Sequence, residues 1–151
     1  MINRSCLLYL SFVSKKMSGE KDLAVLIQNM EPVLNIGEYV FCTVQNLGEI
    51  PDIEKILFLF REHEAVTIVL ERTIADEWSF AYSYISSWIT LNIHSSLEAV
   101  GLTAAFANAL KQGNISCNVV AAYFHDHIFI AREDAEKALK TLIALKSGKR
   151  V

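Results

Sequence analysis

The chain has 151 residues, of which 52% are apolar and 21% are charged. With only 6 glycines and 2 prolines, this composition excludes a disordered or low-complexity chain and supplies enough apolar material for a folded core. The formal net charge of −3 gives no general attraction to nucleic acid or to an anionic membrane surface. No apolar run in the sequence reaches the roughly 18 residues of a membrane-spanning helix, so we expect neither nucleic acid nor a membrane as a partner.

The sequence begins with a short apolar stretch, residues 6–13, preceded by Arg4. This order is typical of a secretory signal peptide, but Ser14-Lys15-Lys16 stand where small residues at a cleavage site would be expected. Met17 then opens a polar sequence typical of a cytoplasmic N-terminus. We therefore interpret residues 1–16 as an N-terminal appendage or a mis-assigned start, in preference to a targeting signal, and we expect a cytoplasmic protein.

The three cysteines, Cys6, Cys42 and Cys117, are too far apart in the sequence to form a CxxC metal or redox motif. Cys42 and Cys117 lie in strand-like runs, where a cysteine is most simply a small buried hydrophobic residue. Free thiols of this kind suit a reducing compartment.

The N-terminal half predicts helices and strands, beginning with a helix. Apolar residues from Leu23 to Met30 recur at helical spacing, and Pro32 ends the helix. Thr73 and Asp76 have capping-box spacing and predict a short helix that ends near Trp78. We further expect a strand at 39–44, a helix from Pro51-Asp52 with Ile53, Ile56, Leu57 and Phe60 on one face, and strands at 65–70 and 80–85.

The C-terminal half has the clearer pattern. Residues 88–94 alternate between apolar and polar, which predicts a half-buried strand, and residues 102–112 have helical spacing that ends at Gly113. We then expect a strand at 115–119, a turn at His125-Asp126, a strand at 127–131 and a helix at 135–143. The order β-α-β-β-α lacks one strand of a ferredoxin-like unit, so that strand must come from elsewhere or be absent.

Several segments of this half share the pattern of a known family. A loop runs from Ser95 into Gly101-Leu102 at the head of a helix, and Ala109-Leu110-Lys111-Gln112-Gly113-Asn114-Ile115-Ser116 leads into the next strand. Residues 126–130 followed by 133–138 complete the pattern. On these residues the segment 88–145 resembles an ACT domain, and the chain from Met17 resembles small bacterial proteins made of two ACT units. The N-terminal unit departs from the family in lacking the Gly-Leu motif.

The resemblance implies an α+β fold of two tandem ferredoxin-like βαββαβ units, each an antiparallel sheet covered by helices on one face. We expect an ACT-like unit with an extra leading helix at 17–85 and an ACT domain at 86–151. The resemblance also implies a stand-alone, non-catalytic regulatory module that senses an amino acid or a similar small ligand. ACT units usually do this through a dimeric or tandem interface, so we expect a homo-oligomer, most simply a dimer.

A local argument places the ligand site. In a ferredoxin-like unit the third strand lies antiparallel between the first two, so the end of the strand at 88–94 lies beside the start of the strand at 127–131. The backbone amides of Gly101 and Leu102 suit a carboxylate at a helix N-terminus, and Asp126 or the amide oxygen of Asn118 suits an ammonium group. The expected site residues are His94, Ser95, Ser96, Val100, Gly101, Leu102, Asn118, His125, Asp126 and His127.

Purely structural roles remain open for these positions. Ser95 and Glu98 have capping-box spacing, Asp126 suits a turn, and Asn118 can simply face solvent. A metal site at His125, His127 and His94 is disfavoured because alternate strand residues point to opposite faces. No nucleophile, P-loop or dinucleotide motif is present in the sequence, so we expect no enzyme activity, no metal and no cofactor.

The alternative function is a structural or oligomerisation scaffold without a small ligand. An antiparallel sheet has open edges that must be covered, and two ACT sheets can cover each other side by side. The sequence also supplies more aromatic surface than two small cores need, and some of it can lie at an interface. These residues are Phe41, Phe58, Phe60, Tyr82, Tyr84 and Trp88.

Overall fold

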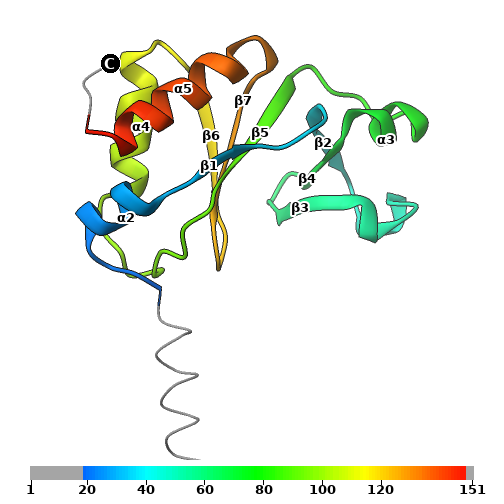
Figure 1. Cartoon of the computed structure of the whole chain (residues 1–151). Helices are drawn as coiled ribbons and strands as arrows, with labels where there is room; N and C mark the ends of the chain where they lie inside the picture. Colours follow the sequence, from blue (N-terminus) through cyan, green and yellow to red (C-terminus); the bar gives the residue numbers. More distant parts are fainter. Residues whose placement is uncertain (1–18, 149–151) are drawn as a thin grey trace, which may run out of the picture.

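A computed structural model of the chain describes residues 19–148 (Figure 1). The expectations for residues 1–16, and Cys6 with them, therefore lie outside the described residues. In the described range the strands form one seven-stranded antiparallel sheet with helices on one face, which confirms the predicted fold class. No helix between residues 19 and 148 is long and apolar enough to cross a membrane.

The C-terminal unit contains two long helices and three of its own strands. Strand β7 lies between β5 and β6 and pairs antiparallel with both, as expected for a ferredoxin-like unit. Helix α4 ends at Gly113, as the sequence predicts. The elements of this unit are β5 (Ile85–Leu91), α4 (Leu102–Gln112), β6 (Cys117–Ala121), β7 (Asp126–Ala131) and α5 (Ala135–Lys146).

The missing strand of the C-terminal unit comes from a segment that precedes it by some fifty residues in the sequence. Strand β1 (Pro32–Leu34) pairs antiparallel with the end of β5. Helix α2 (Leu23–Asn29), which ends ahead of Pro32 as predicted, places Leu26 and Met30 in the core of the same unit. The leading helix therefore packs with the C-terminal unit.

The N-terminal unit has the same strand order with much less helix. Strand β4 lies between β2 and β3, and the first residues of β5 pair with β2 as the fourth strand. Short 3-10 turns at Leu47–Glu49 and Ile53–Lys55 occupy the position of the first helix. The other elements are β2 (Tyr39–Val44), β3 (Ile56–Arg61), β4 (Val66–Glu71) and α3 (Arg72–Glu77).

The helix predicted from Pro51 is wrong. Only Ile53–Lys55 form a single 3-10 turn, and the apolar residues that follow form strand β3 at the edge of the sheet. The spacing of these apolar residues fits a helix, but the five-residue run of aromatic and branched side chains from Ile56 to Phe60 also favours a strand. Pairing with β4 decides between the two.

Two further details differ from the predictions. The strand expected at 80–85 is confined to Ile85, where β5 begins, and the residues before it form a connection. Helix α3 exists, but Glu71 is its N-cap residue and, within the described part of the chain, no side chain caps it. The predicted capping box of Thr73 and Asp76 is therefore wrong.

Strand β5 and the strands that pair with it on one side run through both units. Strands β1 and β2 lie on the same side of β5 and follow one line that is interrupted by residues 35–38. At the interruption, the backbone N–H and the side-chain amide of Asn35 donate to the carbonyl oxygen of Trp88, at 2.8 and 3.2 Å. The two units therefore share β5. The predicted division of the chain between residues 85 and 86 falls just after the first residue of this strand, and that division stays a prediction.

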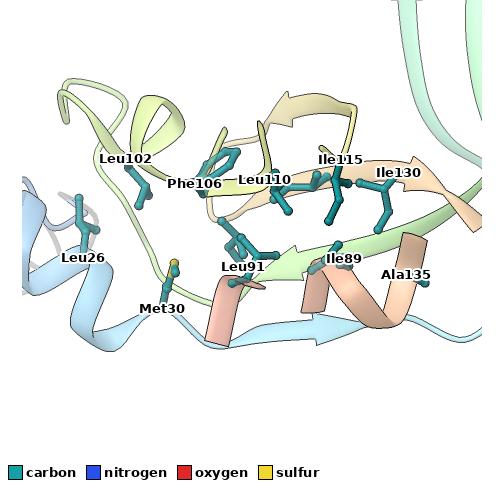
Figure 2. Close-up of a cluster of buried hydrophobic side chains, with 13 residues drawn as sticks. Leu26, Met30, Ile89, Leu91, Leu102, Phe106, Leu110, Ile115, Ile130 and Ala135 are labelled. Carbon is teal, nitrogen blue, oxygen red and sulfur yellow. The ribbon is translucent and has the colours of Figure 1, made fainter. Parts of the chain in front are cut away.

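The helix-covered face of the sheet carries two separate cores. The C-terminal core has 13 buried residues, and Figure 2 shows Leu26 of α2 and Met30, its C-cap residue, at the end of this core that is nearest to Leu102 of α4. The N-terminal core has 8 buried residues, among them the free thiol of Cys42. Burial raises the pKa of that thiol, as expected for a small buried hydrophobic residue.

Glu38 links the two units electrostatically from the interruption between β1 and β2. Its carboxylate accepts hydrogen bonds from Arg72 at 2.8 Å and from Arg132 at 2.5 Å. Each arginine follows the third strand of its own unit. The two guanidinium groups lower the pKa of Glu38, with Arg72 as the larger cause.

Candidate functional site

A pocket of about 230 Å³ lies where the loop after β5 meets the turn between β6 and β7. Three of the predicted site residues, His94, Ser95 and Ser96, line it. Lys21 and Glu98 form an ion pair at the same pocket. The remaining lining residues are Gly19, Leu97 and Tyr123. We call this the loop pocket.

The segment before α2 closes one side of the loop pocket by pairing with the loop after β5. The backbone N–H of Glu20 donates to the carbonyl oxygen of His94, and the N–H of Ser96 donates to the carbonyl oxygen of Glu20, both at 2.9 Å. Gly19 lies so close to Ser95 that a Cβ there would come within 2.4 Å of its backbone. Glycine permits this close approach because it has no side chain.

Asp126 lies beneath the loop pocket and does not line it. It is the first residue of β7, only 5% exposed, and the predicted turn occupies residues 122–125 instead. Burial raises the pKa of its carboxyl group, and hydrogen bonding with Ser95 and the charge of His125 partly oppose this. Asp126 is therefore a buried neighbour of Ser95 and has no position in the pocket lining.

Two of the predicted histidines lie at this end of the unit, in different settings. The ring of His94 packs against Tyr123 and Phe124, with centroids 6.1 and 5.4 Å away. His125 has a buried Nδ1 that finds no hydrogen-bond partner among residues 19–148. Within that same range no three His, Cys, Asp or Glu side chains are grouped closely enough to hold a metal ion.

The predicted contacts at the helix N-terminus do not line the loop pocket. Leu102 is buried in the core, and Val100 is 83% exposed. Gly101 is the N-cap residue of α4 with a φ of 102°, and a Cβ there would be 3.0 Å from the side chain of Leu23. The start of α4 therefore packs against α2.

Asn118 and His127 lie on the helix-free face of the sheet, away from Asp126. Alternation along β7 sends Asp126 toward the helices and His127 to the opposite face, where it contacts Trp88. Asn118 is opposite Phe129 in the ladder and lines a different pocket, with Phe41. The structure therefore separates Asn118 and His127 from the other predicted residues, because they lie on the face of the sheet opposite Asp126.

Sequence reasoning missed five residues of the loop pocket. Leu97 and Glu98 lie inside the loop that was singled out, and Tyr123 is two residues from His125, so their position in the chain could have suggested them. Gly19 and Lys21 come from a segment about 75 residues earlier. No periodicity or motif connects that segment to the loop.

The comparisons with known proteins agree with this architecture. The sequence matches the ACT domain family twice, over residues 18–87 and over residues 83–144. The two matches overlap where the shared strand β5 begins. No curated protein matches the sequence.

Solved structures extend the comparison. A protein of unknown function from Vibrio cholerae, described as a possible transport protein, is 46% identical, and the match covers 83% of this chain and 97% of that chain with a TM-score of 0.74. The ligand-free regulatory subunit of aspartate kinase from Thermus thermophilus is 8% identical over 79% of this chain and 97% of its own, with a TM-score of 0.59. A protein from Agrobacterium tumefaciens is 14% identical over 78% and 89%, also with a TM-score of 0.59.

At 8% and 14% identity the likeness concerns the fold alone. The two family matches and the Vibrio cholerae relative, which aligns over almost its whole length, carry the assignment. The chain therefore belongs to the ACT-domain family, with two matches that together span residues 18–144.

Proposed function

We propose that the protein is a non-catalytic regulatory module that binds an amino acid or a similar small zwitterion in the loop pocket. The observation that carries this proposal is the meeting of opposite charges there, Lys21 and Glu98, with the polar loop His94 to Ser96. An amino acid has one carboxylate and one ammonium group, so it can pair with both charges at once. The fold shared with a regulatory subunit of aspartate kinase supports the regulatory part.

Binding would act by stabilising one arrangement of the loop and of the segment paired with it. Glu20 is held to that loop by two backbone hydrogen bonds, and Lys21 reaches across to Glu98. A ligand that pairs with Lys21 or Glu98 changes the free energy of this contact. Such a ligand favours the paired arrangement of the loop over an unpaired one only by the difference in its affinity for the two arrangements.

The test is a thermal-shift screen of the full chain against the twenty amino acids. A ligand at one hundred times its dissociation constant stabilises the folded state by about 2.7 kcal/mol, which is a rise in Tm of several degrees for a chain of this size. Lys21→Met should abolish the shift for the ligand that is found. The matched control, Lys140→Met on the exposed face of α5, should leave it unchanged.

The proposal is wrong if no amino acid raises Tm at millimolar concentration, or if Lys21→Met keeps the full shift. Asp126→Ala is a poor test because Asp126 is buried, so loss of the side chain would disturb the loop itself. The isosteric variant Asp126→Asn keeps the volume and should retain binding, since Asp126 does not line the pocket.

An assembly role is the second candidate, and one observation favours it. Four large apolar side chains at the same end of the C-terminal unit are exposed, by 48% to 83%. Exposed apolar groups that gather in this way mark surfaces for partners. A second copy covering them would give the dimer expected from the sequence, which sedimentation of the full chain would detect. The residues are Leu97, Val100, Tyr123 and Phe124.

A further inference from the structure

The helix-free face of the sheet is buried in part by its own curvature. Strands β3 and β4 run across the direction of β6 and β7 (Figure 1). On that face a third cluster forms from buried Tyr39, Val69 and Phe129, which are 6%, 0% and 1% exposed. Its neighbours come from both units, Phe41 and Phe58 from one and Trp88 and Val120 from the other.

A second pocket opens beside this cluster, between β3 and the hairpin of β6 and β7. Its volume is about 100 Å³. Most of its wall is aliphatic or aromatic, and His127 adds one imidazole. Leu57 at its rim is 40% exposed, so solvent reaches it. We call this the cross-unit pocket, and its lining is Leu57, Phe58, Trp88, Val120, Ala122, His127 and Phe129.

The hydrogen bonds of His127 fix which nitrogen carries its proton. The indole Nε1 of Trp88 lies 3.1 Å from Nδ1 of His127. An indole N–H can only donate, so Nδ1 must accept. The hydroxyl of Thr90, 3.2 Å from the same Nδ1, fits as a second donor because it already accepts from the side-chain amide of Asn35 at 3.0 Å.

The neutral ring therefore carries its hydrogen on Nε2. If Nδ1 carried the proton, its N–H would face the indole N–H of Trp88, and two donors cannot form a hydrogen bond with each other. Burial also lowers the pKa of His127, which favours the neutral ring. Near neutral pH the cross-unit pocket combines apolar walls with one hydrogen-bond donor, the Nε2–H of His127. Small-molecule sites typically have this composition, with few polar groups that fix the orientation of a ligand.

We propose that the cross-unit pocket is a second ligand site, for a small apolar molecule of about one ring that bears a single hydrogen-bond acceptor. An engineered apolar cavity of 150 Å³ in another protein holds benzene, so the cross-unit pocket, at about 100 Å³ and open to solvent at Leu57, accommodates at most one ring. Charged ligands are excluded, since the lining offers no counter-charge. The site is separate from the loop pocket and shares no residue with it.

Occupation of this site would join the two units. Leu57 and Phe58 belong to β3 of the N-terminal unit, while Trp88 and His127 belong to the C-terminal unit. A ring packed between them adds contacts that exist only when β3 lies against the hairpin of β6 and β7. The ligand therefore stabilises this placement of the units.

Benzyl alcohol and toluene are suitable probes, because they share one ring and only the alcohol has an acceptor oxygen. The readout is the indole N–H signal of Trp88 in nuclear magnetic resonance spectra of the full chain. The chain has 2 tryptophans, and Trp78 lies in the other core beside Phe80. The variant Trp78→Phe assigns the two signals.

Benzyl alcohol should shift the Trp88 signal in a saturable way and leave the Trp78 signal in place. The variant Ala122→Phe, which fills the pocket from an exposed position, should weaken binding at least tenfold. Ala121→Phe, on the adjacent residue with its side chain on the other face, should bind as the parent does. The absence of a Trp88 shift at tens of millimolar, or equal shifts of both indoles, would overturn the proposal.

The role of His127 has its own test. His127→Phe should weaken benzyl alcohol about two- to tenfold, the effect of one neutral hydrogen bond, and change toluene less than twofold. Because both probes meet the same altered pocket, a general loss of packing would weaken them equally. An equal loss would show that Nε2–H of His127 does not contact the ligand.

Discussion

The two ACT units share a strand order and differ in what covers it. The C-terminal unit has helices of 11 and 12 residues and 13 buried core residues, whereas the N-terminal unit has two 3-10 turns, one helix of 6 residues and 8 buried core residues. Only the C-terminal unit has a long loop between its first strand and first helix, and that loop supplies five of the eight residues that line the loop pocket, residues 94–98.

The difference shows that the strand order persists with much less helical cover, while the long loop that lines the site occurs only in the unit whose first strand leads to a long helix. In the N-terminal unit the chain leaves β2 and enters β3 through two short turns. In the C-terminal unit the chain needs ten residues, 92–101, to reach α4, and those residues belong to no strand of the sheet, although Ser95 forms an isolated bridge with Glu20. The long loop therefore accompanies helix α4, because the chain must pass from the end of β5 to the start of that helix.

The largest expected effect on stability comes from truncating a side chain in the C-terminal core. Phe106 is fully buried, and Phe106→Ala should lower the free energy of unfolding by about 3–5 kcal/mol. Because β5 belongs to both units, the loss should appear as one shifted transition in urea. Far-ultraviolet circular dichroism and tryptophan fluorescence, followed together, should report the same midpoint. Two separated midpoints would show that the units unfold independently.

A smaller effect is expected at the turn that distinguishes the two units. Gly101→Ala places a side chain at a φ of 102° and 3.0 Å from Leu23, so it should cost about 1–2 kcal/mol. Gly113→Ala is the comparison at the other end of the same helix, because Gly113 has an ordinary φ of −77° and a Cβ there would be 3.3 Å from the carbonyl oxygen of Leu110, so its loss should be smaller. Chemical denaturation measures both. Equal losses would mean that the backbone of Gly101 is not strained by a side chain.

The sequence predicted best where local pattern and burial agree. Ile89 and Leu91 alternate with polar residues and are fully buried in β5, and the spacing in α4 places Phe106 and Leu110 in the same core. Gly113 ends that helix as expected. In these segments the period of the apolar residues has only one interpretation.

Prediction failed where the pattern is ambiguous or the partner is distant. The residues from Ile53 to Phe60 satisfy helical spacing, yet they continue as a strand because an edge of the sheet was available to pair with them. Strand β1 has three residues, and nothing local connects it to β5. For the same reason Lys21 was not predicted at the loop pocket, and Asp126 was expected in a turn although it begins a buried strand.

The stability of the protein should also depend on pH through His127 of the C-terminal unit, with a smaller effect than that of the two substitutions above. Burial lowers the pKa of His127 below its ordinary value of 6.5. The unfolded chain then binds this proton more readily, so stability should fall as pH decreases from 6.5 toward the lowered pKa. The variant His127→Gln should flatten that part of a plot of Tm against pH. A parallel curve would mean that other groups cause the slope.

The smallest effect concerns Glu38, the link between the units. Its arginine partners lower its pKa below 4.5, so its contribution to stability is complete above that value and is lost as pH falls through the lowered pKa. Glu38→Gln should therefore reduce stability slightly at neutral pH and not at strongly acidic pH. A double-mutant cycle with Arg132→Gln measures the coupling, and zero coupling would show that Arg132 contributes nothing through Glu38.

The pairing of β1 with β5 has a consequence for the order in which parts of the chain can fold during synthesis. Residues 32–34 leave the ribosome long before residues 89–91, with which they pair. Helix α2 can complete its packing only later in synthesis, because part of the core that it joins lies in α5. The N-terminal unit can complete its first three strands during synthesis, but the earliest described segment must remain unpaired until most of the chain has emerged. A chaperone that shields short apolar segments would therefore find its substrate in residues 23–34.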